Sequence, residues 1–437
     1  MKAKLFFLLL TLSGVNYIPA ASATLSTHEE ALVNYIDRHK ADQLKLLENM
    51  VNINSGTENS QGVKKMGEMV RPEFESMGFK TQWVDLPATM KHAGSLVATH
   101  SGSGKRILLI GHLDTVFPIN SPFQSFTLSA DQKFATGPGV IDDKGGVVTL
   151  LYALKALKHA GKLNNANITV VLTGDEEQAA KPTEISRQAL REAAQGSDIA
   201  LGFEFSLAED QLVTNRRGLS EWYLSSTGQS RHSSTVFGPE SGDGAIYETA
   251  RVLNAFRTAF AETSVASGLT LNPGLILGGQ TVSEDVQQNT GNASGKKTVI
   301  AAQTLVHGDL RFYSEDQKNK AEQKMREIAG TSLPLTSSQL TFKDIMPAMP
   351  ETDGNRQLLA QFSAINTALG GPQLKSVPAA ERGGSDVSYI AQTVSASIDG
   401  LGPWGKGAHG LNETLEAASL PVASKRAAIF ISRYLAR

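Results

Sequence analysis

A histidine and an aspartate, His112 and Asp114, stand two residues apart at the end of an apolar run, residues 107–110. In a β-strand alternate side chains point to the same face, so these two can lie side by side. The carboxyl ends of strands in an open α/β sheet are where ligands bind. A metal-bound histidine usually has its other ring nitrogen bonded to a carboxylate, which Asp114 could provide. Alone, the pair is equally typical of a structural polar contact, so the other motifs must decide.

Further acidic residues and a second histidine occur where metal ligands would be needed. Glu176 and Glu177 end another apolar run, residues 167–173, and two carboxylates beside a core cost free energy unless they are paired or bound to a metal. Adjacent residues point opposite ways, so one could be a ligand and the other a general base. Imidazole and carboxylate together suit Zn²⁺, and two histidines with three carboxylates could hold two ions if one carboxylate were shared. The remaining candidates are Asp142, Asp143, Glu204 and His409.

Each of these motifs has a structural interpretation when taken singly, such as a solvated turn at Asp142 or a surface histidine at His409. Their combination is what indicates a metal-assisted hydrolase. The segment Gly137-Pro138-Gly139 begins like a dinucleotide-binding loop. However, Asp142 stands where the third glycine is needed, and Pro138 lacks an N–H group, so nucleotide binding and a nicotinamide oxidoreductase are disfavoured.

Length and composition limit the alternatives. A chain of 437 residues is too long for one ordinary core, which predicts two domains. The formal net charge of -2 offers no basic excess for binding nucleic acid. The sequence contains no cysteine, so disulfides and thiolate ligands are excluded.

Residues 1–23 have the pattern of a secretory signal peptide. Lys2 and Lys4 precede an apolar stretch from Leu5 to Val15, and residues 21–23 form a small-residue cleavage site. A membrane anchor would need about 20 apolar residues, and Asn16 and Pro19 shorten this run. We therefore expect a periplasmic or secreted protein without a membrane segment after cleavage.

Periodicity predicts an α/β protein with a second, smaller domain. Strands alternating with helices indicate a mainly parallel sheet, and a strand-helix-strand texture from residue 216 indicates an inserted α+β unit. The predicted domains are 24–215 and 347–437 for the larger part and 216–346 for the insertion. Helices are predicted at 28–50, 61–77, 147–160, 243–261, 315–329, 357–369 and 420–435, and strands at 81–85, 94–99, 107–112, 167–173, 220–227, 269–277, 281–286 and 298–312.

Three segments, residues 111–116, 137–146 and 173–177, resemble the signatures of the di-zinc carboxypeptidase and aminoacylase family. The resemblance implies a zinc-exopeptidase catalytic domain, an inserted dimerisation domain, two Zn²⁺ ions per subunit and a homodimer. It makes Glu176 the general acid/base and Asp114 the residue that orients His112. It also implies two sets of metal ligands that share Asp142: His112 with Glu204, and Glu177 with His409.

The resemblance extends to substrate-binding residues. His232, in a Gly-x-x-x-His motif, would reach the partner subunit's active site and stabilise the oxyanion. Arg311, at the end of a regular strand, would grip a substrate carboxylate with its planar fork. Gly383, Gly384 and Ser385 match the family's glycine-rich substrate loop.

Within the family, the sequence is most similar to secreted glutamate carboxypeptidases, which implies hydrolysis of a C-terminal residue, with glutamate as the candidate, from peptides or N-acyl amino acids. An N-acyl amino acid deacylase or dipeptidase is the alternative, and a non-catalytic binding protein is disfavoured because every ligand is present. The departures from the family pattern are on the substrate side: Gln178 to Pro182, Phe205 in place of proline, Thr298 to Ala301, and Met346 in place of arginine.

Overall fold

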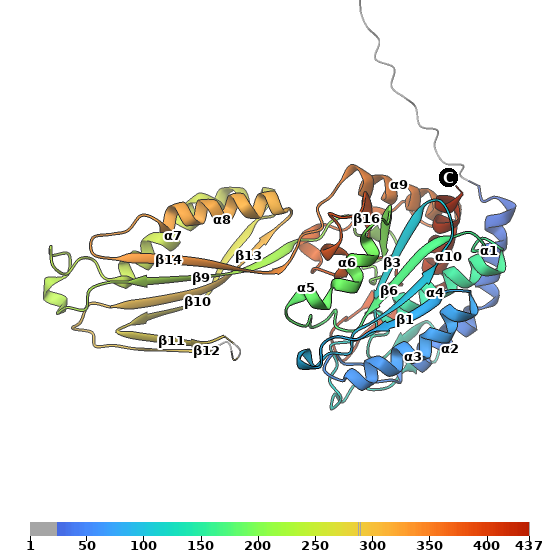
Figure 1. The fold of residues 1–437 in the computed structure, drawn as a ribbon, viewed down its shortest axis with the longest axis horizontal. Coiled ribbons are helices and arrows are strands. Elements are labelled where there is room, and N and C mark those ends of the chain that lie inside the picture. The colour runs from blue at the N-terminus through green and yellow to red at the C-terminus, as the bar shows by residue number, and fades with distance from the viewer. Residues whose placement is uncertain (1–23, 287, 289, 437) are drawn as a thin grey trace, which may run out of the picture.

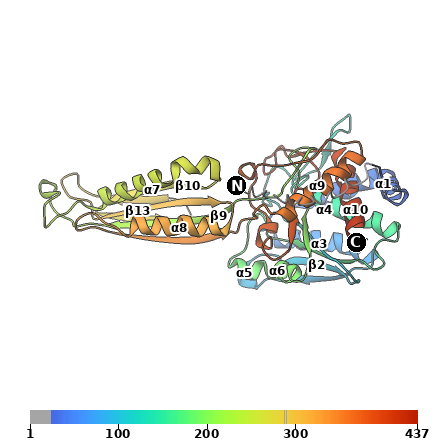
Figure 2. The same ribbon diagram turned by 90° about the horizontal axis from the view of Figure 1, so that it is seen from above.

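The structure, a computed structural model, describes residues 24–286, 288 and 290–436. The predicted signal peptide, residues 1–23, lies outside the described residues. Figure 1 shows a larger part with helices around a sheet and a smaller, elongated part beside it, and the view in Figure 2 shows the same division. Both ends of the smaller part's chain segment return to the larger part, as expected for an insertion.

The larger part is built on a six-stranded sheet in the order β1-β2-β6-β3-β7-β16. Of these six strands only β2 runs against the others, so the predicted mainly parallel sheet is confirmed. Strand β3 pairs with β6 on one side and β7 on the other, and its last residue is His112. The strands are β1 Lys80–Val84, β2 Ser95–His100, β3 Arg106–His112, β6 Asn167–Thr173, β7 Ile199–Gly202 and β16 Ala396–Ile398.

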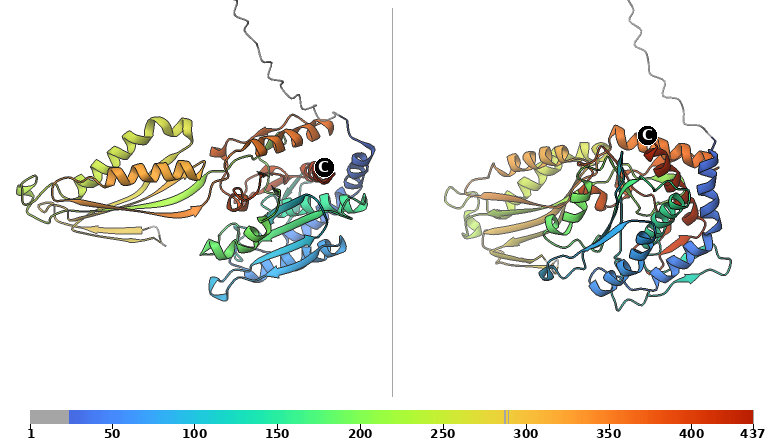
Figure 3. Two further views of the ribbon diagram at one scale, coloured as in Figure 1. Left: turned by 45° about the horizontal axis from the view of Figure 1, so that its top comes forward. Right: turned by 45° about the vertical axis from the view of Figure 1, so that its right-hand side comes forward.

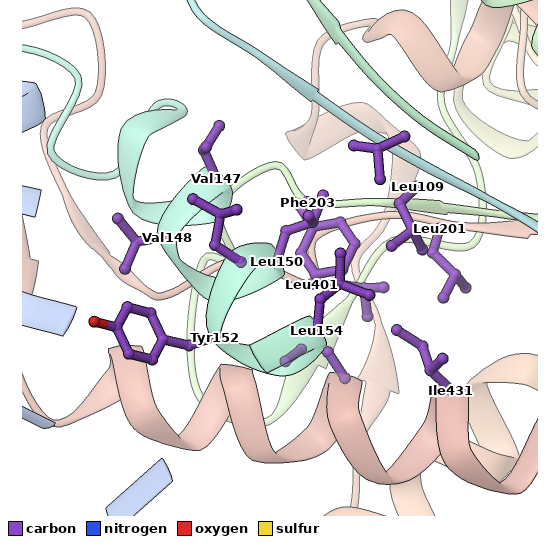
Figure 4. Close-up of a cluster of buried hydrophobic side chains, with 14 of the residues drawn as sticks. Leu109, Val147, Val148, Leu150, Tyr152, Leu154, Leu201, Phe203, Leu401 and Ile431 are labelled. Carbon is purple, nitrogen blue, oxygen red and sulfur yellow. The ribbon is translucent and has the colours of Figure 1, made fainter. Parts of the chain in front are cut away.

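Helices cover both faces of this sheet. Side chains of β3 alternate between two cores, with Leu109 in the larger core and Leu108 in the smaller one. Figure 4 shows Leu109 gathered with Leu150 and Leu154 of α4 and with Ile431 of α10. The larger core also packs α1 Thr27–Arg38, α2 Lys40–Val51, α3 Ser60–Ser76, α4 Lys144–His159, α9 Asp353–Ala368 and α10 Ser419–Leu435, while α6 Gln188–Ala194 packs on the smaller core after α5 Thr183–Ser186.

The helix predicted over residues 28–50 is two helices, α1 and α2. The chain leaves the helical conformation at His39, where φ is -108° and ψ is 21°. The His39 ring contacts the carbonyl oxygen of Tyr35 at 2.7 Å, so a local side-chain contact accompanies the break. Apolar periodicity continues across this point, which is why the sequence pattern did not reveal it.

The smaller part is a four-stranded antiparallel sheet in the order β10-β13-β9-β14 with α7 and α8 packed on one face (Figure 3). The strand predicted at 298–312 begins at Gln303, and β14 was not predicted. Strand β14 lies at an edge and none of its side chains is fully buried, so its apolar pattern is weak. The elements are β9 Gly218–Thr227, α7 Ala245–Ser267, β10 Thr270–Gly279, β13 Gln303–Phe312, α8 Glu315–Ala329 and β14 Ser337–Met346, with a separate hairpin of β11 Thr281–Asp285 and β12 Thr290–Ser294.

Two extended segments join the parts. Arg216 and Met349 exchange two backbone hydrogen bonds there, of 2.9 and 3.0 Å. Within the described residues no helix is long and apolar enough to cross a membrane.

Shorter strands complete the larger part. These strands are β4 Thr127–Leu128, β5 Phe134–Thr136, β17 Gly405–Lys406 and β18 Thr414–Glu416 in one sheet, and β8 Gln211–Leu212 with β15 Lys375–Ser376 in another.

Candidate metal centre and active site

The carboxyl ends of β3 and β7 and the turn before α4 bring the first set of predicted ligands together. His112 ends β3, and its Nε2 lies 3.1 Å from Oδ1 of Asp142 and 3.5 Å from Oε1 of Glu204, which follows β7. One ligand atom from each of these three residues lies within 4.8 Å of the other two. His112 and Asp142 are buried, so the cluster is shielded from solvent.

A second cluster shares Asp142 with the first. Nε2 of His409 lies 3.0 Å from Oδ2 of Asp142 and 3.2 Å from Oε2 of Glu177. The two carboxylate oxygens of Asp142 therefore face different histidines, as a bridging ligand must. Glu177 reaches this place from the turn after β6, and His409 from a loop between β17 and β18.

The charges of the two clusters call for bound cations. Burial raises the pKa of Glu177 to about 7, and hydrogen bonds to Asp142 and Glu177 raise the pKa of His409 to about 11. Oε1 of Glu177 is buried without a hydrogen-bond partner within the described residues. Nitrogen and oxygen donors crowded in this way fit divalent ions such as Zn²⁺.

Asp114 contacts residues of both clusters. Its Oδ1 lies 3.3 Å from Nδ1 of His112, the ring nitrogen that faces away from Asp142. The same carboxylate accepts the backbone N–H groups of Glu176 and Glu177 at 3.0 and 3.1 Å, and the hydroxyl of Thr57 donates to it at 2.6 Å. Asp114 therefore sets the position of His112 and also of the turn that carries Glu176 and Glu177.

The structure adds a residue that sequence reasoning did not single out. Glu413 is buried and accepts backbone N–H groups from Gly139, Ile141 and Asp142, at 3.1, 2.8 and 3.1 Å. Burial raises the pKa of Glu413 to about 8. The sequence around Glu413 carries no signal of this role, because its three hydrogen-bond partners lie 271 to 274 positions away in the chain.

Glu176 occupies the place expected of a proton carrier. Burial and the charge of Glu204 raise its pKa well above the usual value. No side-chain hydrogen bond of Glu176 is present in the part of the chain that the structure describes. Its backbone is held by Asp114, so its carboxylate is positioned but free to exchange protons.

The predicted substrate loop lies on the Glu204 side of the first cluster. Ser385 and Glu204 line the same small cavity with His112. Arg216 donates to the carbonyl of Gly383 at 2.7 Å, and the Ser385 hydroxyl donates to Asp399 at 2.7 Å. A side chain on Gly384 would collide with Met346, so this glycine allows close packing of the loop.

The two predicted residues of the inserted domain lie apart from the clusters. Arg311 pairs with Leu219 at the end of the sheet nearest the larger part, and its Nε lies 3.0 Å from Oδ2 of Asp309. His232 is exposed in the connection between β9 and α7, where its Nδ1 lies 2.8 Å from the Ser234 hydroxyl. Strand β9 leads away from the larger part, so this connection lies at the far end of the insertion (Figure 1).

Comparisons with known proteins agree with this geometry. A family model described as peptidase family M20/M25/M40 matches residues 108–433. The chain is 27% identical over 393 residues to carboxypeptidase G2 of Pseudomonas sp. (strain RS-16), with 89% of this chain and 88% of the relative covered. It is 26% identical over 402 residues to a succinyl-diaminopimelate desuccinylase of Coxiella burnetii, with 87% and 96% covered. A tripeptidase from Staphylococcus aureus has a similar fold, with a TM-score of 0.69, 19% identity and coverage of 91% and 99%.

The family match spans more than half of the chain and includes both ligand clusters. Proteins of this family are metal-dependent hydrolases that typically bind two ions. The predicted family resemblance is therefore confirmed. The chain belongs to the metal-dependent peptidase family M20/M25/M40.

Proposed function

We propose that the protein is a zinc-dependent exopeptidase that releases the C-terminal residue, preferably glutamate, of a peptide or N-acyl amino acid. The observation that carries the proposal is the shared carboxylate of Asp142 between His112 and His409, with Glu176 next to Glu177. The similarity to carboxypeptidase G2 supports release of a C-terminal residue, and the resemblance to glutamate carboxypeptidases makes glutamate the preferred candidate.

Two zinc ions per subunit would occupy the clusters. One ion would be held by His112, Asp142 and Glu204, and the other by Asp142, Glu177 and His409. When bound, such ions polarise the substrate carbonyl and make the attacking water more acidic.

The chain itself supplies the proton transfer. The raised pKa of Glu176 suits a carboxylate that accepts a proton from the attacking water and donates it to the leaving nitrogen. Glu177 points toward His409 and stays a ligand, so the two neighbouring glutamates divide the tasks.

Binding of the substrate would use the insertion and the glycine loop. Arg311 would hold the terminal carboxylate together with the backbone of Gly383, Gly384 and Ser385. The partner subunit's His232 would donate to the developing oxyanion, which makes a homodimer part of the proposal. Residues 1–23 would direct export and then be removed, so this dimer would be found in the periplasm or outside the cell.

A dipeptidase is the second candidate, favoured by a pocket of about 280 Å³ beside Glu177. Thr57, Glu58, Val116 and Gln178 are among its lining residues. The carboxylate of Glu58 is exposed there and would suit the free amino group of a short peptide.

The test is an assay of the purified protein, with zinc and after chelation, on dipeptides and N-acyl amino acids that differ only in the C-terminal residue. Chelator-sensitive release that favours glutamate is expected. Release that ignores the C-terminal residue but requires a free amino group would favour the dipeptidase. Absence of release from every substrate with zinc present would contradict both.

A further inference from the structure

Arg382, directly before the Gly383–Ser385 loop, has a buried guanidinium whose donors are largely unused. Its side chain is 5% exposed, and its Nε is buried without a hydrogen-bond partner. Its one ion-pair contact within the described residues is with Oε2 of Glu204, at 3.7 Å, which is longer than a hydrogen bond. No hydrogen bond from this guanidinium occurs within the described ranges. A buried cation with free donors is unfavourable without an anionic partner.

An aromatic ring holds this guanidinium in place. The guanidinium carbon lies 4.1 Å from the ring centre of Phe205, the residue after Glu204. Stacking on a ring fixes the plane of the fork and leaves its edge free for a carboxylate. The proline-to-phenylalanine departure seen in the sequence therefore creates the surface on which Arg382 rests.

The surroundings of Arg382 cannot neutralise it once the first cluster holds a cation. Glu204 would then share its charge with the ion, because its Oε1 is also 3.5 Å from His112. The neighbouring Arg216 is already paired with Asp399, through Nη2 and Oδ2 at 2.8 Å, so Asp399 is not free to serve Arg382. On the side of the first cluster that carries the substrate loop, the Arg382 guanidinium is thus left without a hydrogen-bonded anionic partner among the described residues.

We propose that Arg382 binds a second carboxylate of the substrate and so selects substrates that carry one beyond the carboxylate assigned to Arg311. This inference rests on the proposed exopeptidase function and deepens it. The second carboxylate can come from an acidic C-terminal side chain or from a dicarboxylic acyl group, and both offer the planar two-oxygen partner that a guanidinium matches.

Two substrate pairs distinguish these sources in the zinc-loaded protein. Ala-Glu is compared with Ala-Gln, and N-succinyl-alanine with its terminal amide, N-succinamoyl-alanine. The wild type is expected to prefer the carboxylate member of one pair by about tenfold or more in kcat/KM. This is the usual effect of losing a charge-assisted hydrogen bond, which the amide member cannot make with Arg382. Arg382→Gln is expected to remove that preference, and Arg382→Lys to keep part of it. The pair that loses its preference identifies the source.

Arg426 provides the matched control. It is also a buried arginine over an aromatic ring, 5.2 Å from Trp404, but Asn366 and the carbonyl of Glu209 accept its hydrogen bonds. Arg426→Gln is expected to lower the melting temperature without changing either substrate ratio. Phe205→Leu, which removes the stacking ring and keeps the arginine, is expected to weaken the preference and replaces Arg382→Gln if that variant does not fold.

Binding affinities measured by calorimetry give a readout that does not require turnover. The zinc-loaded protein is titrated with L-glutamate and L-glutamine, and with succinate and succinamate as the acyl pair. Equal substrate ratios and equal affinities in the wild type and in Arg382→Gln would overturn the inference. A protein that hydrolyses none of the four substrates, yet binds the dicarboxylate more tightly through Arg382, would overturn the proposed function and leave the carboxylate site standing.

Discussion

Glu413 accepts the backbone N–H of Asp142 at 3.1 Å although 271 positions separate the two residues in the chain. The same oxygen accepts the N–H of Ile141, and the other oxygen accepts that of Gly139. The carboxylate thus fixes the turn that presents Asp142, the proposed shared ligand. It also ties this turn to the loop of His409, so both sides of the second cluster depend on it.

Glu413→Ala should weaken zinc binding by about 10- to 100-fold, since loss of a residue that orients a ligand typically has this effect. Three buried N–H groups would lose their partner, and the Asp142 turn would shift. Calorimetric titration of the metal-free protein with zinc measures the change. Glu416→Ala is the control. Glu416 lies three residues after Glu413 in the same segment, and its carboxylate accepts a hydrogen bond from Trp404. Wild-type zinc affinity in Glu413→Ala would contradict the assigned role.

Glu176→Gln should keep zinc content and melting temperature but lose about 10²- to 10⁴-fold in kcat, the usual contribution of a general acid/base. The amide retains the shape of the side chain and cannot accept the proton of the water. Steady-state kinetics and metal analysis of the same preparation test this. Glu177→Gln is the comparison and should lose metal as well as activity. Near-normal turnover by Glu176→Gln would exclude it as the base.

Asp142→Asn should reduce the zinc content from two ions to none, while His409→Ala should reduce it to one. The difference follows from the position of Asp142, whose two oxygens serve different clusters, whereas His409 belongs to the second cluster. Metal analysis after dialysis gives the stoichiometry. Retention of one tightly held ion in Asp142→Asn would argue against a shared ligand.

Complementation between two inactive variants can test the proposed dimer. His232→Ala should lower activity by about 100-fold or more if its donor stabilises the oxyanion. A mixed dimer of His232→Ala and Glu176→Gln subunits would hold one complete site, formed by Glu176 of the first subunit and the partner subunit's His232. Activity should therefore return when the two variants are unfolded together and refolded.

Each variant refolded alone controls for spontaneous recovery of activity. Sedimentation velocity of the wild type shows whether a dimer is present. If the mixture sediments as a dimer but recovers no activity, His232 lies outside the partner's active site.

The sequence by itself determined where β3 and β6 end, and so the positions of two candidate ligands. His112 and Glu177 follow apolar runs long enough for buried strands, and parallel strands deliver their carboxyl ends to one edge of a sheet. Local patterns also predicted helix 315–329, which has the bounds of α8 in the structure. A pattern of this kind depends only on which side chains must be buried.

Tertiary structure alone decided which distant groups meet. Nothing local indicates that Glu413 lies under Asp142 or that Arg382 stacks on Phe205, because these contacts join separate loops whose paths depend on the packing of the whole domain. The break at His39 and the edge strand β14 were missed for a related reason. Apolar periodicity continues through His39, and β14 at the sheet edge buries too little of its side chains to give a clear pattern. Packing of the whole domain decides both features, and the periodicity of a short segment does not report it.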